Sequence, residues 1–157
     1  MSPSEAHDSS ERREREPSPD SEEPVAALNP KLVEKGARIY QQYCASCHGA
    51  QGEGAPNWRE PNALGELPAP PHGPEGHTWR HSDAMLYRMV SEGWRDPFNE
   101  TEHLTMPAFE DVLAPREIKA VITYLKTLWT PEQRAFQEAE TEARGGFPPE
   151  ARAGGAE

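Results

Sequence analysis

The sequence predicts an all-α fold that wraps a group other than the polypeptide itself, and three observations support this prediction. Apolar residues recur at helical spacing in several segments, whereas no run of alternating apolar and polar residues indicates a strand. Only 34% of the 157 residues are hydrophobic, so the protein core must be small. A proline- and glycine-rich segment over 49–81 has almost no apolar periodicity, and a loop of this length needs something to pack on.

Each predicted helix begins at a recognisable N-terminal signal, which is a capping residue, a proline at the first helical position, or both. The third helix has the clearest apolar stripe, and the fourth is charged enough to lie on the surface. The predicted helices are about 31–45 after Asn29-Pro30, about 83–92 after Ser82, about 115–129 from Pro115, and about 131–144 after Thr130-Pro131.

The charge distribution separates the termini from the centre. The formal net charge is −11, of which residues 1–29 carry −5 and residues 132–157 carry −3. We therefore expect residues 1–29 to be a disordered acidic Ser/Pro-rich tail or tether, 30–131 to be the folded domain, and 132–157 to be a charged surface helix with a disordered C-terminal tail. An acidic chain is a poor ligand for nucleic acid and favours partners with basic surfaces.

No apolar run approaches the ~18 residues that a membrane span requires, and no secretory signal is visible. We therefore expect no membrane span in this chain, with a leader or N-terminal anchor removed or absent from it.

The motif that carries chemistry is Cys44-Ala45-Ser46-Cys47-His48. C-x-x-C-H is the c-type haem attachment motif, in which two thiols on one helical turn form thioethers and the histidine binds the iron. It occurs once, so one covalent haem is expected. A thioredoxin-like redox pair would instead follow a strand, and a structural zinc site would need two further ligands, for which His72, His77 and His81 are available.

A low-spin haem needs a second axial ligand, and Met106 is our candidate. Pro107 restricts the backbone of Met106 to extended conformations and so stiffens the ligand loop. A thioether ligand favours reduced iron and raises the reduction potential. The alternatives are an ordinary packing role for this methionine, or a second histidine ligand, for which four candidates exist: His72, His77, His81 and His103.

Over about 31–130 the sequence resembles the class I cytochrome c family. The resemblance rests on the C-x-x-C-H-G motif, on Met106-Pro107-Ala108-Phe109, on the helix that ends near Leu128, and on Gly36 and Tyr40 in the first helix. It implies that the N- and C-terminal helices cross almost at right angles around the haem. Gly36 and Tyr40 would then meet Val121 and Tyr124.

The resemblance also implies the cofactor and its site: one haem c held by Cys44 and Cys47, with His48 and Met106 as axial ligands. A proline carbonyl would accept the other ring N–H of His48, with Pro56 the nearest candidate and Pro61 the second. Trp79 and Arg80 would hydrogen-bond the haem propionates; the alternative for Trp79 is an ordinary packing role.

The implied function is electron transport by a periplasmic, monomeric one-electron carrier rather than an enzyme. Its partners would be redox proteins such as a membrane oxidase, reductase or dehydrogenase. Two alternatives stay open, namely a haem sensor or enzyme with an open iron position, and an electron-accepting subunit of a dehydrogenase or oxidase complex.

Overall fold

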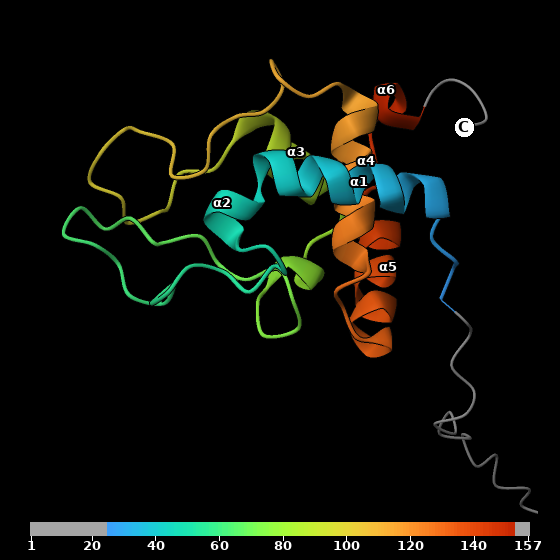
Figure 1. The fold of residues 1–157 in the computed structure, drawn as a ribbon, viewed down its shortest axis with the longest axis horizontal. Helices are drawn as coiled ribbons and strands as arrows, with labels where there is room; N and C mark the ends of the chain where they lie inside the picture. Colours follow the sequence, from blue (N-terminus) through green and yellow to red (C-terminus); the bar gives the residue numbers. More distant parts are fainter. Residues whose placement is uncertain (1–24, 153–157) are drawn as a thin grey trace, which may run out of the picture.

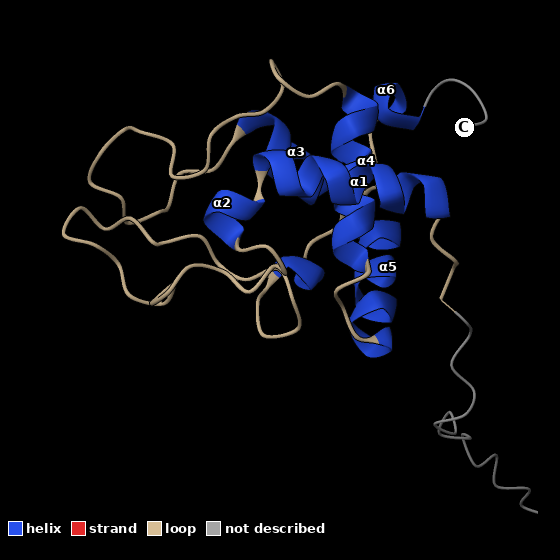
Figure 2. Ribbon diagram, in the orientation of Figure 1, coloured by secondary structure: helices blue, strands red, loops and turns tan. Residues whose placement is uncertain are grey.

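The structure is a computed structural model that describes residues 25–152, and all regular secondary structure in this range apart from one isolated bridge is helical (Figure 2). None of the described helices is long and apolar enough to cross a membrane. In chain order the helices are α1 (Pro30–Tyr43), α2 (Ala45–His48), the 3₁₀ turn η1 (Thr78–Arg80), α3 (Asp83–Glu92), α4 (Pro115–Lys126), α5 (Pro131–Arg144) and α6 (Pro149–Arg152). The all-α prediction is therefore confirmed, and the four predicted helices lie within a few residues of their expected bounds.

Helices α1 and α4 cross steeply at the centre of the molecule (Figure 1). A Cβ atom added to Gly36 would overlap the Ala120 carbonyl oxygen and would lie 2.8 Å from Cβ of Tyr124. The missing side chain at Gly36 therefore lets the two backbones approach closely. The ring of Tyr40 packs against that of Tyr124, with 5.2 Å between the centroids. The expected contact with Tyr124 is confirmed, and Ala120 is the residue that faces Gly36 most closely.

The protein core lies around this crossing and is small, as the composition predicts. Tyr40 of α1 and Ile122 of α4 have no exposed surface, and Ile118 of α4 is 1% exposed. Leu86 of α3 closes the core from the side. Both helices thus place their apolar stripes on one shared interior.

Two long loops occupy the end of the molecule beyond α2, seen at the left of Figure 1. The first connects α2 to η1 and the second connects α3 to α4. They are held together by a hydrogen bond from the Glu100 N–H to the Leu64 carbonyl (2.8 Å) and by one from the Leu67 N–H to the Asp96 carboxylate (2.8 Å). The chain therefore does wrap its longest irregular segments around one end.

The expected charged helix is present as α5, with Gln137 as its buried residue, but this region packs more closely than expected, and residues 153–157 of the expected tail lie outside the described residues. In α5, Gln137 is only 1% exposed, and its amide donates to the Asp83 carboxylate and the His81 carbonyl. Beyond α5, Phe147 and Ala151 join the protein core through α6. The sequence pattern concealed this packing because α5 buries a polar side chain rather than an apolar stripe. The tail expected over 1–29 lies outside the described residues up to residue 24.

Candidate functional site

Cys44, Cys47 and His48 lie on one helical turn at the junction of α1 and α2. The Cys44 N–H closes α1 by donating to the Tyr40 carbonyl (2.9 Å), and the His48 N–H donates to the Cys44 carbonyl (2.9 Å). Both cysteines are free; Cys44 is half-buried and Cys47 is exposed. Burial, followed by the neighbouring Cys47, raises the pKa of the Cys44 thiol to about 11. The turn thus presents two thiols and one imidazole from a rigid backbone.

The His48 ring is buried and held in one orientation. Its Nδ1 lies 2.8 Å from the carbonyl oxygen of Pro70. A carbonyl only accepts hydrogen bonds, so Nδ1 carries the proton and Nε2 keeps a free lone pair. Burial lowers the pKa of His48, which favours the neutral imidazole that binds metals. These donors fit a covalently held haem, since they are two free thiols beside an oriented, neutral imidazole.

The proline that orients His48 is Pro70, not Pro56 as expected or Pro61 as the second choice. The chain leaves the site just after Gly54, whose N–H donates to the His48 carbonyl (2.7 Å), and returns at Ala69, whose carbonyl accepts from the Ala55 N–H (2.9 Å). Pro56 and Pro61 lie in the excursion between these points. A possible signal was the stiff Pro68-Ala69-Pro70-Pro71 run, which suits a fixed carbonyl better than an isolated proline does.

The backbone after the motif is fixed by α1. The Tyr40 hydroxyl donates to the Gly49 carbonyl (2.6 Å), and the Gln41 side-chain amide donates to the Ala50 carbonyl (2.8 Å). Sequence reasoning gave Tyr40 a packing role only, and missed that its hydroxyl connects the helix crossing to the segment beside His48.

A second imidazole, that of His72, lies directly against His48. The ring centroids are 4.0 Å apart, and His72 Nδ1 lies 2.7 Å from the Thr78 hydroxyl. Two imidazoles on opposite sides of one metal ion stand about 6 Å apart between ring centres, given metal–nitrogen bonds of roughly 2 Å. His72 therefore packs on the same side as His48 and is poorly placed as the opposite axial ligand.

Met106 stands at the base of the second loop, on a short antiparallel bridge with Trp94. The backbone N–H of each residue donates to the carbonyl of the other at 3.0 Å. Met106 is half-buried and is followed by Pro107 as the sequence indicates. The bridge gives this methionine a fixed backbone, which an axial ligand requires.

Trp79 and Arg80 lie together on η1. The indole N–H of Trp79 donates to the Gly76 carbonyl (2.9 Å), and the Arg80 guanidinium lies 5.0 Å from the Trp79 ring centre. Phe136 of α5 packs edge-on against Trp79, with centroids 5.3 Å apart. The indole donor is thus already engaged within the chain, whereas Arg80 is exposed.

The remaining histidines do not assemble a metal site in the described residues, where no group of three or more His, Cys, Asp or Glu side chains could hold an ion. His77 is exposed, and His81 uses its backbone carbonyl to accept from Gln137. The zinc alternative that draws on His72, His77 and His81 thus gains no support from this part of the chain.

Comparison with known proteins agrees with this geometry. The family model described as cytochrome c matches residues 33–129. The chain is 32% identical over 105 residues to the dehydrogenase subunit of a quinone-dependent alcohol dehydrogenase from Acetobacter aceti, covering 65% of this chain and 11% of that protein. It is also similar to the cbb3-type cytochrome c oxidase subunits FixP of Sinorhizobium medicae (29% over 108 residues; 64% of this chain, 32% of that protein) and CcoP of Rhodobacter capsulatus (32% over 109 residues; 63% and 32%). The chain thus spans about a third or less of the length of these relatives.

Proposed function

Because the chain belongs to the cytochrome c family, we propose that it is a monohaem one-electron carrier with His48 and Met106 as the axial ligands. The observation that carries the proposal is the turn on which Cys44, Cys47 and His48 lie together, with the His48 ring held by the Pro70 carbonyl. A bound haem c supplies an iron that takes up and releases one electron.

The chain's own residues supply binding, orientation and shielding. Cys44 and Cys47 would hold the porphyrin, and His48 would bind the iron through Nε2. The Pro70 carbonyl makes the His48 ring a stronger electron-pair donor by accepting a hydrogen bond from its Nδ1–H. Met106, on its bridge with Trp94, would supply sulfur on the other side, which favours the reduced iron.

Arg80 is the better candidate of the two expected propionate contacts. Arg80 is exposed, and its guanidinium lies 5.0 Å from the Trp79 ring centre, a cation–π contact that does not use its N–H donors. Trp79 would contribute packing, because its own N–H is engaged by Gly76.

The relatives named above are subunits of an alcohol dehydrogenase and of cbb3-type oxidases. We therefore include in the proposal that this domain exchanges electrons with redox protein partners, either as a free monomeric shuttle or as part of a larger assembly. Because c-type haem is attached outside the bacterial cytoplasm, the proposed location is the periplasm.

The test is expression with haem-maturation machinery, followed by acid–solvent extraction and visible spectra of both oxidation states. We expect a pigment that stays with the protein and a weak sulfur-to-iron charge-transfer band in the ferric spectrum. Met106→Leu should abolish this band, whereas Met85→Leu, on α3, should keep it. Extractable or absent pigment would overturn the proposal. A band that survives Met106→Leu would exclude Met106 as ligand, and a high-spin wild type that readily binds carbon monoxide would favour the open-site alternative.

A further inference from the structure

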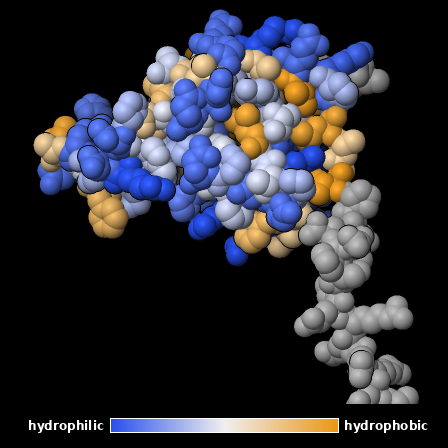
Figure 3. Space-filling model, turned by 60° about the horizontal axis from the view of Figure 1, so that its bottom comes forward, coloured by the Kyte–Doolittle hydropathy of each residue, from blue (hydrophilic) through white to orange (hydrophobic). Residues whose placement is uncertain are grey.

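The two long loops gather most of the exposed large apolar side chains of the described residues. We call residues 57–68 and 95–104 the loop platform. Phe98 at its tip is 88% exposed, and Leu64, Leu67 and Leu104 are 45%, 40% and 48% exposed. Outside the loop platform, exposed large apolar side chains in the described residues are Val112 and Phe136. Figure 3 shows apolar patches among charged ones at this end of the molecule. Such clustering marks an interaction site more often than scattered apolar residues do.

The loop that carries Phe98 is internally braced. The Asn99 side chain is 4% exposed and accepts from the Thr101 N–H (2.8 Å) while donating to the His103 carbonyl (3.2 Å). The Arg95 guanidinium donates to the carbonyls of Thr101 (2.7 Å) and Asn99 (2.9 Å). An aromatic ring held out by a preformed loop has already lost much of the entropy that binding costs.

The two loops form a single surface. Asp96 is 8% exposed and accepts from the Leu67 N–H across the gap between them. Gly65 has a φ of 78° and lies so close to the Phe98 carbonyl that any side chain at position 65 would overlap it. The backbone of Phe98 therefore packs directly against the first loop at Gly65, so the position of Phe98 relative to residues 57–68 is fixed.

The charges of the loop platform are mainly negative. Glu60, Glu100 and Glu102 are exposed and Glu66 is half-exposed. Asp96 is buried between the loops, and the two cations of the platform are exposed: Arg95, whose guanidinium donates to loop carbonyls, and Arg59, whose guanidinium lies 4.5 Å from the Trp58 ring centre. Five carboxylates against two guanidinium groups give the platform a formal charge of −3. An apolar tip with an acidic rim is complementary to an apolar socket with a basic rim.

The loop platform is also continuous with the proposed redox site. Residues 95–104 run directly into the Met106 bridge, and residues 57–68 run directly into Pro70, which orients His48. The two platform loops are therefore connected directly to the segment that bears Met106 and to the segment that orients His48.

We propose that the loop platform docks a redox protein whose apolar socket is ringed by Lys or Arg, with Phe98 entering the socket. This inference rests on the proposed function. A second copy of this chain is the less favourable occupant, since two acidic platforms on chains of net charge −11 repel each other.

The test measures electron transfer between the holoprotein and two metal-complex cations: oxidation of the ferrous protein by tris(phenanthroline)cobalt(III), whose ligands are apolar, and reduction of the ferric protein by hexaammineruthenium(II), whose ligands are not. We expect Phe98→Ser to slow the phenanthroline reaction by roughly threefold or more, as losing contact with one aromatic ring implies, and to leave the hexaammine reaction unchanged. Val112→Ser, at a 55% exposed apolar residue outside the platform, is the matched control and should change neither.

The charge arm uses Glu100→Gln with Glu102→Gln. At low salt both cations should react about twofold or more slowly with this variant, with a weaker dependence on ionic strength. Glu132→Gln with Glu142→Gln removes the same charge from α5 and should have a clearly smaller effect on both rates.

A protein probe completes the test. Reduced mitochondrial cytochrome c, whose haem edge is ringed by lysines, is titrated into the reduced ¹⁵N-labelled holoprotein. Amide shifts are expected over the loop platform, residues 57–68 and 95–104, in wild type but not in Phe98→Ser. Equal rates for Phe98→Ser and Val112→Ser, or amide shifts centred elsewhere, would overturn the docking proposal. So would a concentration-dependent dimer that Phe98→Ser dissociates, because the occupant would then be a second copy. Protein without covalent haem would instead overturn the proposed function, and the amide shifts would still test the platform.

Discussion

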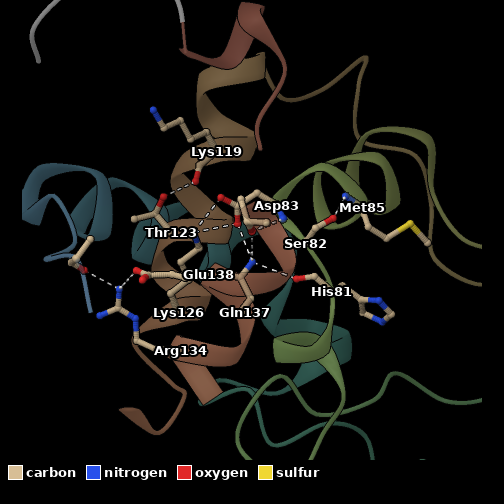
Figure 4. Close-up of polar contacts among 12 residues, drawn as sticks. His81, Ser82, Asp83, Met85, Lys119, Thr123, Lys126, Arg134, Gln137 and Glu138 are labelled. Atoms are coloured by element: carbon tan, nitrogen blue, oxygen red, sulfur yellow. Dashed lines mark hydrogen bonds and ion pairs between the residues drawn. The ribbon is translucent and has the colours of Figure 1, made fainter. Parts of the chain in front are cut away.

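Asp83 and Lys126 form an ion pair from which solvent is almost excluded. Lys126 Nζ lies 2.9 Å from Asp83 Oδ1, and the two side chains are only 13% and 9% exposed. The same carboxylate oxygen accepts from the Gln137 amide at 2.7 Å, and the Asp83 N–H donates to the Thr141 hydroxyl at 3.1 Å. Figure 4 shows the side chains of Asp83, Lys126 and Gln137 converging from α3, α4 and α5. Asp83 of α3 is thus the residue through which α4 and α5 are joined.

We expect Lys126→Met to destabilise the holoprotein by about 3 kcal/mol, because the substitution leaves the Asp83 carboxylate buried without its cation. Methionine keeps most of the apolar stem, so the loss reports the charge rather than the packing. Guanidinium denaturation followed by far-ultraviolet circular dichroism measures the free energy of unfolding.

The control for this prediction is Arg144→Met. Arg144 pairs with Glu140 at 2.8 Å, but its side chain is 72% exposed. An ion pair in solvent contributes little, so this variant should lose less than about 0.5 kcal/mol. Equal losses for the two variants would show that the Asp83–Lys126 pair has no special role.

We expect Gly36→Ala to lower the free energy of unfolding by about 2 kcal/mol or more. Alanine favours a helix interior by roughly 1 kcal/mol over glycine, so the substitution would stabilise an isolated helix. Here the added methyl group would overlap the Ala120 carbonyl and force α1 away from α4. The sign of the change therefore decides whether the crossing is as close as the structure has it.

Thermal denaturation measures this effect, with Glu34→Ala on the exposed side of α1 as control. Glu34 makes a solvent-exposed pair with Arg38, so its loss should shift stability by no more than about 0.5 kcal/mol. A Gly36→Ala protein more stable than wild type would contradict the predicted close crossing.

The local rules predicted most of the fold because its signals are local. Asn29-Pro30, Ser82 and Thr130-Pro131 begin helices where capping chemistry says they should. The glycine at position 36, which is unfavourable in a helix interior, is explained by the close approach of α4. The C-x-x-C-H motif likewise defines its own turn, so the positions of Cys44, Cys47 and His48 follow directly.

The features that sequence reasoning missed depend on contacts between distant segments. Pro70 meets His48 only after an excursion of the chain, and distance along the sequence favoured Pro56. Gln137 can be buried because its amide donates a hydrogen bond to the Asp83 carboxylate, 54 positions away in the sequence. A polar side chain on a charged helix is predicted to be exposed unless its hydrogen-bond partner is known. The residues of α5 alone therefore do not predict that this helix packs against α3.

Tyr40→Phe should flatten the loss of stability above pH 10. Burial raises the pKa of Tyr40, whose hydroxyl also donates to the Gly49 carbonyl. In the unfolded chain the phenol ionises near pH 10, while in the folded protein it stays protonated. The unfolded state therefore binds fewer protons above this pH, and stability falls by up to about 1.4 kcal/mol per pH unit. Below pH 10 this contribution is fully present.

The measurement is the free energy of unfolding at several pH values from 8 to 11.5. At neutral pH the variant should be less stable by about 1 kcal/mol, because it loses the Tyr40 hydrogen bond and the Gly49 carbonyl keeps only the longer one from the Gly52 N–H (3.2 Å). Above pH 10 the difference should shrink, and near pH 11 the two curves should cross, because only the wild type loses up to about 1.4 kcal/mol per pH unit from Tyr40. Parallel curves over the whole range would show that Tyr40 does not account for the alkaline sensitivity.

Gly54→Ala should raise the reduction potential of the holoprotein while leaving the haem attached. Gly54 has a φ of 81°, and a Cβ atom there would lie 2.7 Å from the Pro71 nitrogen and 3.0 Å from the Pro70 carbonyl carbon. The substitution would push the Pro70 carbonyl away from His48 Nδ1 and weaken the bond that makes this ring a strong donor. A weaker donor stabilises ferric iron less. A lost hydrogen bond of roughly 0.5–1.5 kcal/mol corresponds to an increase of about 20–60 mV for a one-electron couple.

Gly146→Ala, where the nearest atom is 3.9 Å from the new Cβ, should leave the potential unchanged. Spectroelectrochemical titration measures both, and an unchanged potential in Gly54→Ala would show that the Pro70 carbonyl does not tune the iron.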